Sequence, residues 1–193
     1  MYTIILTMII NNDTIIKDDN PLLRTKSKDV ELPLSNEDED LLMDMFKYVD
    51  ESTIEEIATK KNLRPAVGIS AIQVGIPKKM TAVILKDGEG NMVYKYALVN
   101  PKIISNSIEK AYLKTGEGCL SVEDEHNGLI YRSARIKVKA YDLLTDKEVL
   151  IKADGYLAIV LQHEIDHFSG KLFYDHINKS NPMYEDPNAI CIE

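Results

Sequence analysis

The sequence is poor in cysteine, in long apolar runs and in positive charge, and each shortage excludes a class of protein. Two cysteines, Cys119 and Cys191, cannot build the disulfide framework of a small secreted domain, so a cytoplasmic location is expected. Lys and Arg total 23 against 31 Asp and Glu, a balance that disfavours a DNA-binding protein, which needs a basic face. With 45% hydrophobic residues, the 193-residue chain is expected to form a single domain, residues 1–193.

The longest apolar stretch lies near the start of the chain, over residues 2–10. It is too short to cross a bilayer, which takes about 20 residues. It also lacks a basic segment before it and a small-residue cleavage site after it. We therefore expect a β-rich segment packed on the domain, and no membrane partner.

Helical signals occur at both ends of the domain. Ser35 is suited to cap a helix with an acidic first turn, and apolar residues then recur at helical spacing as far as Val49. A second short helix is expected over residues 53–61. Residues 156–168 form a later and more apolar helix, which Gly170 ends.

The middle of the chain is typical of strands, and Asn100-Pro101 is expected to interrupt one of them. The last two extended segments are expected to pair as a hairpin. Extended structure is predicted over residues 79–85, 92–99, 102–105, 135–141 and 148–153. The pattern predicts an α+β fold of mostly antiparallel strands, with an N-terminal helical segment and one late, apolar helix.

The sharpest chemical signal is His163-Glu164-Ile165-Asp166-His167 on the late helix. Residues four apart share a helix face, so the two imidazoles can bind the same divalent metal ion. Glu164 lies beside that face, where a general base that activates water is needed. The alternative is an ordinary surface helix with two histidines, which fits poorly with the apolar residues on the same helix.

A catalytic metal site also needs a third protein ligand and an open position. The candidates are Cys119, His126, His176 and the acidic residues. Cys119 stands out because it follows two glycines that flank Glu117, and because a thiolate is a strong donor to Zn²⁺ or Fe²⁺. The alternative for a lone cysteine is a small buried side chain.

Three separated motifs together resemble those of the peptide deformylase family. They are residues 66–73 (Ala-Val-Gly-Ile-Ser-Ala-Ile-Gln), 117–121 (Glu-Gly-Cys-Leu-Ser) and 162–167 (Gln-His-Glu-Ile-Asp-His). The resemblance extends from about Pro21 to Asp175. It implies a metallohydrolase that removes the N-formyl group from the N-terminal formyl-methionine of newly made polypeptides and releases formate. It also implies that formyl-methionyl nascent peptides are the substrates, and it makes the ribosome surface a candidate partner.

The resemblance assigns a metal and a catalytic group. Cys119, His163 and His167 match the family's metal ligands, which implies one divalent ion per chain. Iron, as Fe²⁺, is expected in the cell, and the donor set also suits Zn²⁺, Ni²⁺ or Co²⁺. Glu164 matches the catalytic acid/base.

The resemblance also assigns the groups around the substrate. The Gln73 amide and the Leu120 N–H match the family's oxyanion donors. Val67 and Gly68 are expected to bind an extended peptide on one side, and Gly118 on the other. The methionine side chain is expected in an apolar pocket near Val67, Tyr156, Ile159 and Val160, although plain helix core is the alternative for Ile159.

The chain departs from the family pattern at two positions of the first motif. Ala66 replaces a glycine and Ser70 replaces an alanine, so Ala66 would be strained if its φ were positive. The segment over residues 123–129 is longer than in the compact form of the family and resembles the longer-loop branch found in Gram-positive bacteria. This resemblance implies mostly antiparallel sheets around the late helix and an extended C-terminal segment from about residue 176, with which Asn181-Pro182 agrees.

Asp166 lies on the late helix, on the side of His163 away from Glu164. We expect it to support the helix by pairing with an arginine of the strand after residues 123–129. The resemblance to the family implies Arg132, with Arg135 as the second choice. The alternative is a solvated aspartate.

Two other classes of protein share parts of this pattern. A metalloendopeptidase would recruit a later His or Glu as third ligand rather than Cys119. A metal-binding module without activity would close the site with a fourth side chain such as His126.

Overall fold

The computed structural model describes residues 8–193. The β-rich segment expected near the start of the chain lies mostly outside the described residues. Its last part, residues 8–10, forms no strand, although Ile10 is buried.

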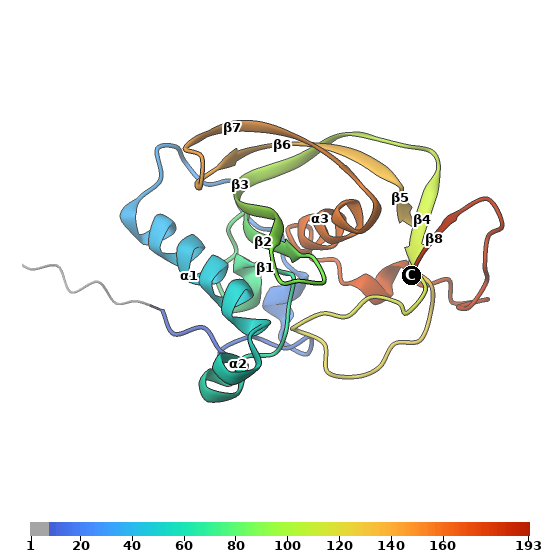
Figure 1. The fold of residues 1–193 in the computed structure, drawn as a ribbon, viewed down its shortest axis with the longest axis horizontal. Coiled ribbons are helices and arrows are strands. Elements are labelled where there is room, and N and C mark those ends of the chain that lie inside the picture. Colours follow the sequence, from blue (N-terminus) through green and yellow to red (C-terminus); the bar gives the residue numbers. More distant parts are fainter. Residues whose placement is uncertain (1–7) are drawn as a thin grey trace, which may run out of the picture.

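The larger of two sheets has five antiparallel strands in the order β1-β2-β3-β6-β7 (Figure 1). The first strand, β1, is very short and lies at one edge of this sheet. The strands are β1 (Gly68–Ser70), β2 (Met80–Lys86), β3 (Met92–Asn106), β6 (Arg135–Asp142) and β7 (Lys147–Asp154).

Two helices, α1 (Asn36–Ser52) and α3 (Gly155–His167), cover opposite faces of this sheet. The alternation along β2 produces this arrangement, because successive side chains of a strand point to opposite faces. Ala82 and Ile84 pack in the cluster that contains α1, whereas Val83 and Leu85 pack in the cluster that contains α3. The short helix α2 (Glu55–Lys61) follows α1.

The helix that carries the two histidines is central, as expected. Its buried residues include five apolar ones in succession, from Leu157 to Leu161, and also His163, Glu164 and His167. A helix buried on most of its circumference holds its side chains in one arrangement, because neighbouring groups restrict every rotamer. The described residues therefore confirm an α+β fold with mainly antiparallel sheets around this helix.

The expected break at Asn100-Pro101 is wrong. The strand β3 continues through both residues to Asn106, and its register with β6 shifts between Val99 and Lys102. Asn100 has a φ of 51°, so the chain absorbs the proline as a bulge rather than ending the strand.

A second, smaller sheet was not predicted. It has the order β5-β4-β8 and places the C-terminal strand β8 (Ile190–Ile192) parallel to β4 (Lys110–Leu113). The two-residue strand β5 (Arg132–Ser133) pairs with the other side of β4. The long loop between β4 and β5 contains Cys119, so this sheet anchors both ends of that loop.

The C-terminal segment packs against the extended loop that the sequence singled out. The Leu129 N–H donates to the Pro182 carbonyl at 2.8 Å, and Gly128 lies directly against Ile177. In the described part of the chain, no helix combines the length and the apolar character that crossing a bilayer requires.

Candidate active site

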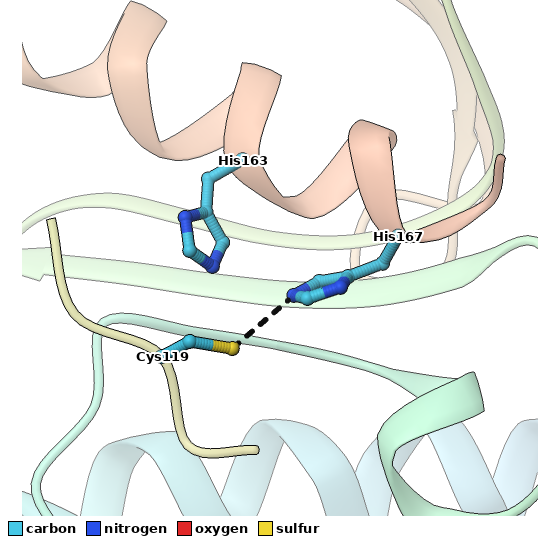
Figure 2. Close-up of side chains that lie close together, drawn as sticks. All are labelled: Cys119, His163 and His167. Atoms are coloured by element: carbon cyan, nitrogen blue, oxygen red, sulfur yellow. Dashed lines mark hydrogen bonds between the residues drawn. The ribbon is translucent and has the colours of Figure 1, made fainter. Parts of the chain in front are cut away.

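Cys119, His163 and His167 converge on one point. Their ligand atoms all lie within 4.8 Å of one another, and the Cys119 Sγ is 3.6 Å from the His167 Nε2. Figure 2 shows the two imidazoles extending from one side of α3 towards the thiol on the loop. In the described residues no fourth His, Cys, Asp or Glu joins this group. The arrangement is an open three-ligand site, the kind that catalytic metals occupy.

The surroundings of Cys119 favour the thiolate form of its side chain. Burial raises its pKa, but the electrostatic influence of His167 and a hydrogen bond with His163 outweigh burial and lower the pKa to about 6. The thiolate is the form that binds metals. One thiolate and two imidazoles therefore form a donor set that fits a divalent transition metal.

Glu117 fixes the orientation of the His163 ring. Its Oε2 lies 2.8 Å from the His163 Nδ1, which leaves Nε2 directed towards the Cys119 thiol. The carboxyl is almost fully buried, yet hydrogen bonds from His163 and Arg132 overcome desolvation and hold its pKa below the ordinary value. A carboxylate on the outer nitrogen of a ligand histidine fixes the tautomer and the ring orientation.

Arg132 joins this carboxylate to the helix. Its Nη2 donates to Glu117 at 2.8 Å and its Nη1 donates to Asp166 at 2.9 Å. The expected Arg132–Asp166 pair is therefore confirmed. The other candidate, Arg135, pairs with Glu109 at an exposed site instead.

Glu164 lies beside the metal ligands with its carboxylate buried against β1. Its Oε2 accepts a hydrogen bond from the Ser70 hydroxyl at 2.7 Å. The carboxylate also packs on Gly68, where an added Cβ would lie 2.5 Å from Oε1. A side chain at position 68 would therefore force the Glu164 carboxylate to shift from its present place.

Gln73 and Leu120 also lie beside the thiol. The buried Gln73 amide donates to the Ser121 hydroxyl at 3.2 Å and lies 3.4 Å from the Cys119 Sγ. Its oxygen accepts from the Ser70 N–H at 2.8 Å, which fixes the amide orientation. The Leu120 N–H donates to no other group of the described residues.

A cavity of about 320 Å³ opens at the cluster. It is lined by every residue that the sequence assigned to the site except His167, which lies behind it. The assigned lining residues are Val67, Gly68, Gln73, Gly118, Cys119, Leu120, Tyr156, Ile159, Val160, His163 and Glu164. Their individual roles stay predictions.

The other histidines lie outside the cluster. His126 stacks on Tyr174, with ring centroids 4.1 Å apart, and His176 contacts Asp166 at 2.7 Å. Neither is the third ligand, and His126 does not close the site. Ala66 is not among the described residues with positive φ, so the departure from glycine there causes no backbone strain.

The sequence did not predict two contacts of the site, that of Glu117 with His163 and that of Ser70 with Glu164. Glu117 was part of a motif and flanked by glycines, but nothing in the sequence indicated that it would face His163. Ser70 was visible only as a departure from the family pattern, and its hydrogen bond to Glu164 depends on how β1 meets α3.

Comparison with known proteins places this geometry in a family. The polypeptide deformylase family model matches residues 12–183. Peptide deformylase 2 of Bacillus subtilis is 47% identical over 185 residues, covering 96% of this chain and all of the relative. A crystal structure of peptide deformylase from Ehrlichia chaffeensis has a TM-score of 0.68 and 32% identity, covering 91% of both chains. A Met-Ala-Ser-bound peptide deformylase from Acinetobacter baumannii has a TM-score of 0.67 and 28% identity, covering 89% of this chain and all of the other.

Proposed function

The chain belongs to the polypeptide deformylase family, and we propose how its own residues perform the reaction of that family. It is a metal-dependent amidohydrolase that removes the formyl group from N-terminal formylmethionine. The observation that carries the proposal is the convergence of Cys119, His163 and His167 beside the Glu164 carboxylate in one cavity.

The three ligand residues hold one divalent metal ion, which we propose is Fe²⁺ in the cell. Membership of the family supports iron, and the mixed sulfur and nitrogen donor set is compatible with iron as well as with Zn²⁺, Ni²⁺ or Co²⁺. When bound, such an ion supplies Lewis acidity that polarises a carbonyl and activates water near neutral pH. The contact of Glu117 with the His163 Nδ1 keeps the His163 ring oriented so that its Nε2 can bind the metal.

Glu164 transfers the proton in this proposal. Its Oε1 accepts a proton from the water that attacks the formyl carbon and then donates it to the amine nitrogen as the C–N bond breaks. The products are formate and a free amino terminus. A positioned general acid/base contributes about 10²–10⁴ to a rate.

Gln73 and Leu120 stabilise the charge that develops on the formyl oxygen. The Leu120 N–H donates to no other group of the described residues, and Gln73 lines the same cavity. For Gln73 to donate to the substrate, one of its contacts with Ser121 or Cys119 has to open. Removing one oxyanion donor costs about 10²–10³ in kcat.

The formylated peptide binds as an extended strand. The edge position of β1 supports this, because one side of an edge strand makes no hydrogen bonds within the sheet. We propose that Val67 and Gly68 hold one side of the peptide and Gly118 the other. The methionine side chain then lies against Tyr156, Ile159 and Val160, which line the cavity. We further propose that residues 1–193 act as one catalytic domain, with newly made chains as substrates and the ribosome surface as a partner.

An anaerobic assay tests the proposal. Formate release from formyl-Met-Ala-Ser is measured with protein loaded separately with Fe²⁺, Ni²⁺ and Zn²⁺, and we expect turnover that is highest with Fe²⁺. No release with any of these metals would overturn the enzymatic proposal.

Glu164→Ala tests the proposed base. We expect it to retain the metal and the fold but to lose about 10²–10⁴ in kcat. A matched control is Glu125→Ala, in the exposed loop, which leaves kcat unchanged. Substantial turnover by Glu164→Ala would show that another group accepts the proton.

A further inference from the structure

Ser70 is a buried polar residue at the end of β1, where the motif of the family has alanine. Its side chain is fully buried, and its hydroxyl lies 2.7 Å from the Glu164 Oε2 and 3.1 Å from the Glu164 backbone oxygen. An alanine has no group that could form either contact. Serine in place of alanine at position 70 therefore provides a hydrogen-bond donor to the Glu164 carboxylate, the group that transfers the proton in the proposed mechanism.

The two oxygens of Glu164 are in different surroundings. Oε2 faces the Ser70 hydroxyl, and the Thr81 hydroxyl lies 3.5 Å from the same oxygen, although it bonds more closely to the Ile69 carbonyl at 2.9 Å. Oε1 packs beside Gly68 and accepts no hydrogen bond from the described residues. Because both Gly68 and Glu164 line the cavity, Oε1 is the oxygen left for a proton from water.

From this asymmetry we infer that Ser70 is a positioning residue, which holds Oε2 so that Oε1 stays directed at the reacting water. The inference rests on the proposed role of Glu164. The physical reason is that the terminal torsion of a glutamate is broad, so an unrestrained carboxylate samples many orientations. A hydrogen bond to a charged acceptor is short and strong enough to select one of them.

A purely structural role is the alternative, because the same hydroxyl also contacts the Glu164 backbone and so links β1 to α3. The two roles affect different quantities. A structural link contributes to the free energy of unfolding, whereas a positioned carboxylate changes kcat without changing how tightly the peptide or the metal binds.

Ser70→Ala separates the two roles. It introduces the residue that the family motif has, so the variant is expected to fold. We expect kcat for formyl-Met-Ala-Ser to fall about tenfold, less than the loss of the general base itself, while KM and metal content stay unchanged.

The matched control is Thr145→Val in the turn between β6 and β7. The Thr145 hydroxyl also donates to a buried carboxylate, that of Asp142, at 2.8 Å. It lies outside the cavity, so its removal leaves kcat unchanged. This control separates the loss of any hydroxyl–carboxylate bond from the loss of the one on Glu164.

The Glu164→Gln background tests whether Ser70 acts through Glu164. Once the base has been removed, Ser70→Ala should cause no further fall in kcat, because nothing remains to position. A further tenfold loss in that background would overturn the inference, and so would a kcat for Ser70→Ala within about twofold of wild type. Absence of turnover in the wild type would overturn the proposed function together with this inference, so the two failures are distinguishable.

Discussion

His163 and His167 lie one helical turn apart and face the same point, yet their outer surroundings differ. The His163 Nδ1 bonds to Glu117, which Arg132 links to Asp166. The His167 ring is 1% exposed, and its Nδ1 has no hydrogen-bond partner in the described residues. One histidine is oriented by a charged network on its outer nitrogen, whereas the other is held by burial and by the contact of its Nε2 with the Cys119 thiol.

This difference shows that a symmetric sequence motif does not imply symmetric support. The charged network draws on three separate segments, namely the loop after β4, strand β5 and helix α3. It binds the cysteine-bearing loop to the helix, so it fixes the distance between the ligands as well as the ring of His163. The two halves of the site should therefore respond differently to substitution.

The largest effect is expected from removing a metal ligand, because His163 and His167 are equivalent as ligands even though their outer surroundings differ. Cys119→Ser, His163→Ala and His167→Ala should each abolish stoichiometric metal binding, because each removes one of only three protein donors. Elemental analysis of the purified variants measures this. His126→Ala and Cys191→Ser are the controls and should retain the metal; full metal content in Cys119→Ser would exclude the third ligand.

Arg132→Ala should strongly lower the free energy of unfolding, because it disrupts the network of Glu117, Arg132 and Asp166 beside His163. It removes the cation from a nearly buried Glu117 carboxylate, and an uncompensated buried charge costs about 3–5 kcal/mol of unfolding free energy. Chemical denaturation measures the loss. Arg135→Ala is the matched control, because its pair with Glu109 is exposed and contributes about 0–1 kcal/mol. Equal effects of the two variants would contradict the assignment.

Glu117→Gln should weaken metal binding without abolishing it. The amide preserves the shape of the side chain but removes the charge that orients His163, and such substitutions cost about 10–100-fold in metal affinity. Competition with a chelator measures the affinity. Glu125→Gln, on the exposed loop, should leave the affinity unchanged. If Glu117→Gln behaved in the same way, the network would have no role in metal binding.

Asp166→Ala should have the smallest effect of the series. Asp166 is partly exposed, and Arg132 keeps its bonds to Glu117 when Asp166 is removed, so the loss is smaller than for Arg132→Ala. Metal retention and stability should still fall together. In a double-mutant cycle with Arg132→Ala we expect a coupling of about 0.5–3 kcal/mol; simple additivity would show that the two residues do not interact.

Much of the fold was predictable, because it depends on local patterns. The apolar spacing after Ser35 predicted α1, and alternation predicted the hairpin of β6 and β7. The bulge at Asn100 was not predictable, since the pairing partner β6 compensates for the proline. The small sheet was also missed, because its strands are short and β8 comes from the far end of the chain.

The identity of the metal ligands and of the neighbouring glutamate followed from the sequence alone. Helical spacing places His163 and His167 on one face, and the three motifs together indicated Cys119 and the family. The histidine pair and Glu164 depend on residue types and short-range helix geometry, whereas Cys119 was selected among the candidate third ligands by the resemblance to the family.

Tertiary structure alone decided how each group is held. Whether Glu117 faces His163, and whether the Ser70 hydroxyl reaches Glu164, depends on the relative placement of segments that are far apart in the sequence. Arg132 was predicted to reach Asp166, but its stronger attachment to Glu117 was not. The physical reason is that a hydrogen bond forms or fails within a fraction of an ångström, and only packing of the whole domain determines distances so closely.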